Sequence, residues 1–208
     1  MSRRKVFAAL LIVVGILFFA IPIVYHYTGM RETEKLTKEF EQNLEEVQED
    51  ETEMEETGEE ETEAAISEED AATLAKAEVI GLIESEALDI KYAVLEGAGS
   101  YELSCGIGHI PDTAGIGETG NCVLAGHNGS RHGTYFTNLK TLKEGDVIKL
   151  TDKKGSRYFY EVESMEVVDP YDNSVKDQGE GKVLTLLTCE NSGTMRLTVR
   201  CSLKEAVE

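Results

Sequence analysis

The chain has 208 residues, with 40 acidic and 20 basic side chains, and a formal net charge of −20. This length provides for one folded domain with accessory segments. The basic residues form no stripe of the kind that neutralises a phosphate backbone, so nucleic acid is excluded as an expected partner.

The acidic residues are concentrated in one segment. Residues 31–70 contain 19 acidic and 3 basic side chains, a net charge of −16, whereas residues 71–208 contain 21 and 14, a net charge of −7. The excess negative charge therefore belongs to a segment that precedes the folded domain.

The N-terminus carries the pattern of a membrane anchor. An uncharged run over residues 6–27 follows three basic residues, Arg3, Arg4 and Lys5, and about 20 apolar residues are enough to cross a bilayer as a helix. This predicts a cytoplasmic tail over residues 1–5, a transmembrane helix over residues 6–27 and an extracellular domain, in a single-pass protein of the cell membrane. A cleaved signal peptide is the alternative, but the run is long for one and no Ala-x-Ala site follows it.

Residues 28–70 are expected to form a flexible acidic linker. They are rich in Glu and Thr and hold too few large apolar residues to offset the entropy lost on ordering. Leu36, Phe40, Leu44 and Val47 have helical spacing, which allows a transient amphipathic helix. We expect the linker to lift the following domain off the membrane. It should also be too polar to stay docked in an apolar groove.

Residues 71–208 have the pattern of an all-β domain. Short apolar runs alternate with turn signals, and seven or eight such strands indicate a barrel or a sandwich. The segments expected to be strands are Val79–Glu84, Ile90–Leu95, Asn121–Ala125, Asp146–Leu150, Arg157–Val168, Val183–Cys189 and Met195–Cys201.

The last two strands bring a thiol and a guanidinium together. If Ser192-Gly193 forms a two-residue hairpin turn, Cys189 lies directly opposite Arg196 on the same face of the sheet. Arg200 lies four residues further, roughly 13 Å away. A thiol at a strand end needs a base to become a nucleophile.

His127 is the best candidate for that base. It follows a short apolar strand and is flanked by small residues, so a partner or substrate can approach its backbone closely. Together, Cys189, His127 and Arg196 would supply a nucleophile, a general acid and base, and an oxyanion donor. A catalytic site of this kind requires no cofactor.

The remaining cysteines show no sign of a metal site. Cys105, Cys122 and Cys201 have no Cys-x-x-Cys spacing, so zinc is not expected. Cys122 and Cys201 fall in strand-like runs and are interpreted as small buried hydrophobic residues, with a disulfide as the alternative. The acidic residues show no clustered oxygen-ligand spacing, so no metal site is predicted.

Several segments resemble the signature of the sortases, the cysteine transpeptidases of bacterial surfaces. These are Ala125-Gly126-His127, Thr185-Leu186-Leu187-Thr188-Cys189, and Arg196 seven residues after the cysteine. The resemblance covers about residues 79–203 and extends, in the same order, to Gly108-His109, Phe136-x-x-Leu139 and Leu142-x-x-Gly145-Asp146. Its motif is specific to the family.

The resemblance implies a closed eight-stranded sortase-type β-barrel with short helices as the catalytic domain, residues 71–208. It also implies a protein substrate with a C-terminal sorting signal similar to Leu-Pro-x-Thr-Gly, and an amine from a cell-wall precursor or a protein as the acceptor. By position, Ala125, Val168 and Thr188 would line the substrate groove and His109 would lie near it. Packing in the core or rim is the alternative for each.

Two other functions remain open for such a chain. One is a pilin-polymerising sortase, which typically carries an Asp-Pro-aromatic lid upstream of the barrel. Here Asp169-Pro170-Tyr171 follows a long predicted strand, so we assign it to a specificity loop. The other is a peptide-binding module that keeps the fold but does not catalyse a reaction. The presence of all three reactive residues, Cys189, His127 and Arg196, disfavours this alternative.

Overall fold

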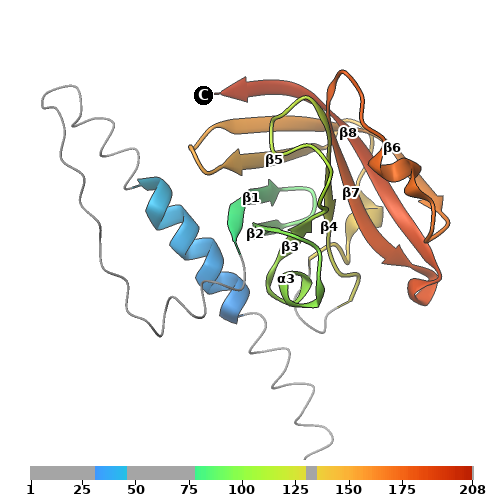
Figure 1. Ribbon diagram of the computed structural model, residues 1–208, viewed down its shortest axis with the longest axis horizontal. Helices are drawn as coiled ribbons and strands as arrows, with labels where there is room; N and C mark the ends of the chain where they lie inside the picture. The colour runs from blue at the N-terminus through green and yellow to red at the C-terminus, as the bar shows by residue number, and fades with distance from the viewer. Residues whose placement is uncertain (1–30, 46–77, 130–134, 208) are drawn as a thin grey trace, which may run out of the picture.

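The computed structural model describes residues 31–45, 78–129 and 135–207. Eight strands close into a barrel in the order β1-β2-β3-β4-β7-β8-β6-β5, drawn in Figure 1. The predicted all-β closed barrel is therefore confirmed. The strands are β1 (Val79–Ser85), β2 (Ile90–Glu96), β3 (Ile107–His109), β4 (Gly120–Ala125), β5 (Val147–Asp152), β6 (Arg157–Val168), β7 (Lys182–Glu190) and β8 (Met195–Val207).

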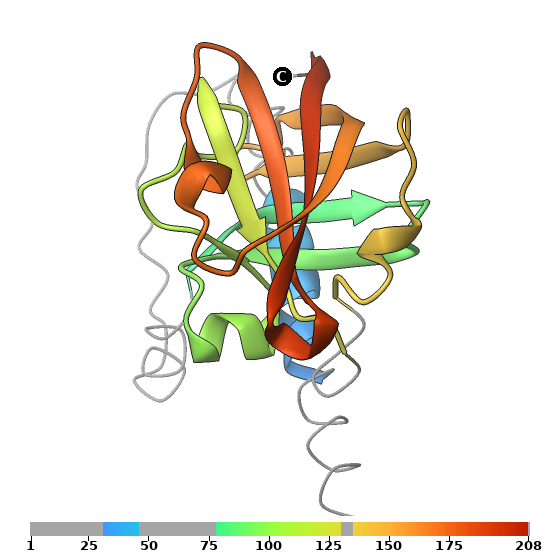
Figure 2. The ribbon, with the colours of Figure 1, turned by 90° about the vertical axis from the view of Figure 1, so that its right-hand side faces the viewer.

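Short helical segments connect the strands. The α-helix α3 (Ser100–Cys105) precedes β3, and three 3-10 turns follow, namely η1 (Leu139–Thr141), η2 (Asn173–Lys176) and η3 (Asn191–Gly193). Both α3 and η3 lie at the lower end of the barrel in the two views of Figures 1 and 2. The strand β3 has only three residues and is not among the strands expected from the sequence.

Two parallel pairs determine where the strands end. β2 pairs with β3 and β4 pairs with β7 in parallel, whereas the other neighbours are antiparallel. Ala125, the last residue of β4, is in register with Leu187 of β7. Because parallel strands run in one direction, the residues that follow Ala125 and Leu187 emerge at the same end of the barrel.

The barrel interior is filled by branched and aromatic side chains from all eight strands. In β3 the core residue is Ile107. Cys122 and Cys201 are 1% and 0% exposed and lie in this core, as predicted. All four cysteines are free, so the alternative of a disulfide is wrong. The largest fully buried side chains include Tyr135, Tyr160, Phe136, Ile83, Leu124, Leu184 and Leu186.

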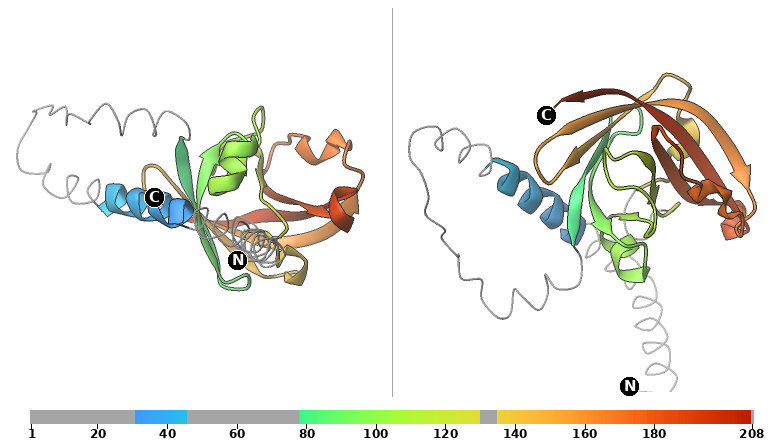
Figure 3. Two further views of the ribbon diagram at one scale, coloured as in Figure 1. Left: turned by 90° about the horizontal axis from the view of Figure 1, so that it is seen from below. Right: turned by 45° about the horizontal axis from the view of Figure 1, so that its top comes forward.

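Part of the expected linker is folded. Residues 31–45 are helical, and this docked helix lies against the β1 and β2 side of the barrel (Figure 3). Phe40 packs with Leu82 and Ala93, and Leu36 and Leu44 pack against the same cluster. The expectation of a flexible linker is therefore wrong for residues 31–45, because the helical spacing of these apolar residues presents one buried face to the barrel.

The remaining N-terminal predictions lie outside the described residues. This applies to the cytoplasmic tail, to the transmembrane helix over residues 6–27 and to residues 46–77. Among the residues that are described, no helix is both long enough and apolar enough to span a membrane.

Candidate active site

Cys189 lies near the end of β7, in a row of residues that crosses three strands. It is directly opposite Arg196 of β8, and Arg196 is in turn opposite Val168 of β6. Residues in register across neighbouring strands share one face of the sheet. The thiol is half-buried, so it remains open to a substrate on that face.

The turn between β7 and β8 fixes this register. Ser192 has φ 57° and ψ 31°, Gly193 has φ 89°, and the Thr194 N–H donates to the Asn191 carbonyl at 3.3 Å. Positive φ at both central residues is the geometry of the two-residue turn that suits a twisted hairpin. The predicted turn at Ser192-Gly193 and the predicted pairing of Cys189 with Arg196 are both confirmed.

The guanidinium of Arg196 is held by the turn itself. Its Nη1 donates to the carbonyls of Gly193 and Met195, each at 3.0 Å. A guanidinium has five N–H donors, and these two bonds use only those of Nη1. The turn thus fixes a charged, planar donor group beside the strand that carries Cys189.

His127 is brought to the same place by hydrogen bonds on both sides of it. Before it, the Gly126 N–H donates to the Leu187 carbonyl at 3.1 Å, and the Thr188 hydroxyl donates to the Gly126 carbonyl at 2.6 Å. After it, the Asn128 side-chain amide donates to the Cys189 carbonyl at 2.7 Å. Since both neighbours of His127 are bonded to residues 187–189, this half-buried residue lies beside the end of β7.

The residue before His127 must be small. A Cβ built on Gly126 would lie 2.8 Å from both Ile107 Cδ1 and the Phe136 ring, closer than real Cβ atoms come. The Phe136 N–H also donates to the His127 carbonyl at 3.1 Å. The glycine therefore lets the chain leave β4 tightly against Phe136, which sets the start of the histidine loop.

The predicted substrate-binding residues occupy different surroundings. Ala125 and Val168 are half-buried at the ends of β4 and β6. Val168 also lines a cavity of about 180 Å³ between the β6–β7 loop and the barrel wall, together with Thr185 and Arg200. Thr188 is 3% exposed and its hydroxyl is bonded to Gly126. The prediction that its side chain lines the groove is therefore wrong, because Thr188 instead joins β7 to the histidine loop.

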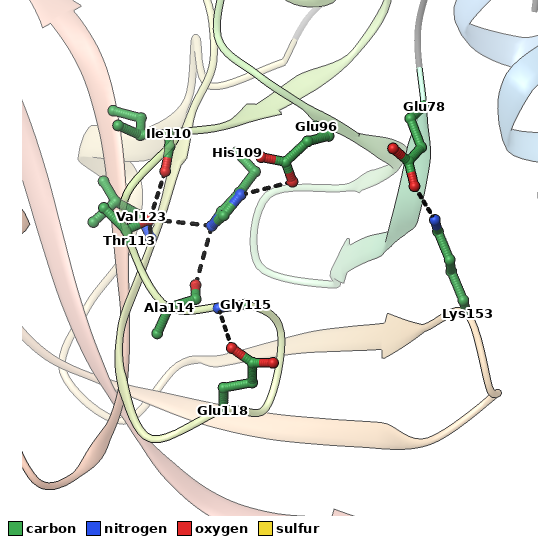
Figure 4. A network of polar contacts seen from close by, with 10 residues as sticks. All are labelled: Glu78, Glu96, His109, Ile110, Thr113, Ala114, Gly115, Glu118, Val123 and Lys153. Atoms are coloured by element: carbon green, nitrogen blue, oxygen red, sulfur yellow. Dashed lines mark hydrogen bonds and ion pairs between the residues drawn. The ribbon is translucent and has the colours of Figure 1, made fainter.

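His109 has the contacts of the alternative, structural role. The ring is 5% exposed, with Nδ1 3.0 Å from Glu96 Oε2 and Nε2 3.0 Å from the Ala114 carbonyl and 3.1 Å from Thr113 Oγ1. Figure 4 shows this network, in which Glu118 caps the next turn at Gly115. One ring nitrogen contacts the end of β2 and the other contacts the loop after β3, so His109 is a structural anchor.

A comparison with known proteins identifies the family. The family described as "Sortase domain" matches residues 83–204.

The chain belongs to the sortase family.

Individual sortases show how far the similarity extends. Sortase A of Bacillus anthracis is 34% identical over 119 residues, which is 57% of this chain and 55% of that protein. Sortase D of Bacillus subtilis is 31% identical over 110 residues, 52% of this chain and 53% of that protein. The chain thus spans about half the length of the curated relatives it matches.

Solved sortase structures share the fold. A Clostridium perfringens Sortase D5 transpeptidase is 29% identical, with a TM-score of 0.63 over 84% of this chain and 99% of that one. A lid mutant of Sortase A from Corynebacterium diphtheriae is 30% identical, with a TM-score of 0.59 over 64% of this chain and 74% of that one.

Within this sortase domain, burial separates Cys189 from the other thiols. Burial raises the pKa of Cys122 and of Cys201 to about 12, and burial also raises the pKa of Cys105. A thiol reacts as its thiolate. Burial therefore favours the protonated form of these three thiols, and half-buried Cys189 is the candidate nucleophile.

Two residues near the sortase site were missed in the sequence. Asn128, whose side chain reaches the Cys189 carbonyl, was not among the predicted site residues. Tyr135, whose ring centroid lies 6.5 Å from that of His127, was not among them either. A sequence signal existed for Asn128, which directly follows the histidine, but the partner of Tyr135 is set by tertiary packing alone.

Proposed function

We propose that the chain is a membrane-anchored cysteine transpeptidase that cleaves a sorting signal similar to Leu-Pro-x-Thr-Gly and transfers the protein to an amine of the cell wall. The observation that carries the proposal is the row in which Cys189 and Arg196 face each other beside the His127 loop, in a domain of the sortase family. These groups provide a nucleophile, an acid and base, and a cationic donor.

In the first half of the reaction, Cys189 is the thiolate, and its sulfur attacks the threonine carbonyl carbon of the signal. The carbon–nitrogen bond to the following glycine breaks, and protonated His127 gives its proton to the leaving amine. The product is a thioester between Cys189 and the cleaved protein.

In the second half, the acceptor amine attacks that thioester. His127, now neutral, accepts a proton from the amine, the carbon–sulfur bond breaks, and Cys189 is released as the thiolate. The net reaction exchanges one amide bond for another, so it needs neither a cofactor nor an oxidant.

Arg196 has a role in both halves. Each attack places negative charge on the carbonyl oxygen, and fixed donors aimed at that charge stabilise the transition state. The two bonds that hold Nη1 to the turn fix the guanidinium in place before the substrate arrives. Ala125, at the end of β4, and Val168, which lines the adjacent cavity, are proposed to contact the signal.

The alternatives receive less support. Tyr171 of the Asp-Pro-Tyr segment is 87% exposed, and the Asp169 carboxylate accepts a hydrogen bond from the Tyr171 N–H at 2.8 Å. This segment therefore forms its own turn after β6 and does not cover Cys189 as a lid would. A binding module without turnover would not need a half-buried thiol, an arginine and a histidine brought together at one end of the barrel.

The test is mass spectrometry of the full chain incubated with a panel of sorting-signal peptides and candidate amines. We expect a thioester adduct on Cys189 and an amide product, and neither should form with Cys189→Ala. His127→Ala should reduce turnover nearly as far while its far-ultraviolet circular dichroism stays that of the wild type. Turnover by folded Cys189→Ala would refute the mechanism, and binding without cleavage by the wild type would favour the binding module.

A further inference from the structure

Tyr135 lies between the docked helix and the histidine loop. Its side chain is 1% exposed, and its hydroxyl donates to the Ser104 carbonyl at 2.9 Å. The same oxygen is 2.8 Å from Thr33 Oγ1 of the docked helix. Since the phenol has one proton and gives it to Ser104, the Thr33 hydroxyl is the donor in the second bond. Two separate segments therefore hold one hydroxyl.

The ring of Tyr135 reaches the catalytic histidine. Its centroid lies 6.5 Å from that of His127, with 46° between the planes, and 5.1 Å from that of Tyr92 in an edge-to-face arrangement at 62°. The next residue, Phe136, donates its N–H to the His127 carbonyl at 3.1 Å. A displacement of Tyr135 would therefore be felt by both the ring and the backbone of His127.

The backbone of Tyr135 is held in an unfavourable conformation. Its φ is +32°, which is unfavourable for a non-glycine residue and persists only where the surroundings enforce it. The two hydroxyl bonds and the packing on Tyr92 supply that enforcement. Loss of one hydroxyl partner should let the residue relax away from this position.

The docked helix is attached strongly enough to act as such a support. Along β2, the short strand β3 covers only Val94–Glu96. The N–H of the preceding residue, Ala93, donates to Thr37 Oγ1 at 3.1 Å. Thr37 therefore satisfies a backbone donor at the uncovered edge of β2. Further along the helix, Phe40 is 7% exposed and Glu41 forms an ion pair with Lys91. The end of the helix that carries Thr33 points to the same end of the barrel as α3 (Figure 1).

We propose that the docked helix completes the active site: Thr33 holds the hydroxyl of Tyr135, and Tyr135 is a positioning residue that keeps the His127 ring in place beside Cys189. This inference rests on the proposed role of His127 as acid and base. It makes residues 31–45 part of the working enzyme, so that turnover depends on a helix that touches neither the substrate nor the reacting atoms.

The test compares Thr33→Val with Leu44→Ala in the full chain in detergent micelles. The first variant removes the hydroxyl that holds Tyr135, and the second removes an apolar contact of the same helix away from Tyr135. The ring signals of the histidines are followed through a pH titration by carbon-13 NMR, with the His127 signal identified by its loss in His127→Gln. We expect Thr33→Val to shift the His127 signal or its pKa and to leave the His109 signal unchanged. Leu44→Ala should lower the unfolding temperature without moving the His127 signal.

Kinetics supply the second measurement. Thr33→Val should lower kcat about fivefold, the equivalent of one hydrogen bond, with little change in KM. Tyr135→Phe, which keeps the ring and loses both hydroxyl bonds, should lower kcat at least as much, and the double variant should be no slower than Tyr135→Phe because the bond to Thr33 is already lost in that single variant.

The proposal is overturned if Thr33→Val leaves the His127 signal at its wild-type position, or if Leu44→Ala moves that signal equally. Additive losses in the double variant would also contradict it. Failure of the wild type to cleave any peptide would instead refute the proposed function, and the NMR comparison would still decide whether Thr33 and Tyr135 position His127.

Discussion

The side-chain amide of Asn128 donates a hydrogen bond to the backbone carbonyl of Cys189, with 2.7 Å between nitrogen and oxygen. Because Asn128 directly follows His127, this bond helps to set the spacing between the histidine loop and the strand that carries the proposed nucleophile. It is the counterpart, on the far side of His127, of the bond from Thr188 to Gly126.

Replacement of Asn128 should therefore slow the reaction without unfolding the barrel. We expect Asn128→Ala to lower kcat about fivefold, since one hydrogen bond contributes about 1 kcal/mol. Asn128→Asp should be worse, because an ionised carboxylate cannot donate and repels the Cys189 carbonyl. The measurement is kcat with a cleaved peptide, with exposed Asn43→Ala on the docked helix as the control. Equal activity of the Asp variant and the wild type would show that the bond is not needed.

The two arginines of β8 should respond very differently to substitution. Arg196→Lys should lower kcat about a hundredfold or more, the usual loss for an oxyanion donor, because lysine lacks the planar fork. Arg200 is in register with Thr185 instead, four residues from Arg196, so Arg200→Lys should leave kcat nearly unchanged. Steady-state kinetics of both variants provide the check, and equal losses in kcat would contradict the assigned role.

The hairpin turn offers a prediction on stability. Gly193 has φ +89°, and a Cβ there would meet no atom within 4 Å, so the cost of Gly193→Ala comes from the backbone conformation alone. We expect about 1 kcal/mol of destabilisation. Gly179→Ala is the matched control, since its Cβ also meets open space without a positive φ. Urea unfolding of both variants measures the difference, and equal stabilities would show that the turn relaxes at no cost.

Much of this architecture was readable from local sequence patterns. The register of Cys189 and Arg196 followed from a turn of two small residues, and the strands followed from apolar runs between turn signals. The structural role of His109 was not readable because one of its partners, Glu96, lies on a different strand, thirteen residues earlier in the chain. The three-residue β3 carries too short a pattern to be seen.

The docked helix shows where composition misleads. Its high acidity suggested a disordered linker, but the residues that bind it to the barrel are few and lie on one face of the helix. Thr33 and Thr37, 3% and 8% exposed, each find a hydrogen-bond partner on the barrel. Such partners are supplied by the tertiary structure, so two threonines in an acidic sequence gave no signal of docking.

The buried thiols should make the protein sensitive to alkali. Burial raises the pKa of Cys122 and Cys201 to about 12, from the ordinary 9.0. Above pH 9 the unfolded chain therefore loses protons that the folded chain retains, and the free energy of unfolding falls as pH rises from about 9 to 12. Cys122→Ala with Cys201→Ala should flatten this dependence in urea titrations at several pH values. An unchanged slope would assign the effect to other groups, such as Tyr135.

Phe40 should anchor the docked helix. Phe40→Ala removes a ring that is 7% exposed and should destabilise the helix–barrel contact by about 3 kcal/mol. Lys38→Ala, which removes only the exposed pair with Glu34, should change little. Hydrogen exchange of residues 31–45 measures the effect, and protection equal to the wild type in Phe40→Ala would show that the ring does not hold the helix.

The docked helix also limits how far the acidic segment can separate the catalytic domain from the membrane. Residue 45 and residue 78 both belong to segments held on the barrel, so residues 46–77 begin and end on one body and add nothing to its height above a bilayer. With the proposed anchor over residues 6–27, only residues 28–30 separate the membrane exit from the docked helix. Three residues span about 10 Å at most. The catalytic domain would then work close to the lipid surface, on signals presented at the same height, instead of ranging through the cell wall on a long arm.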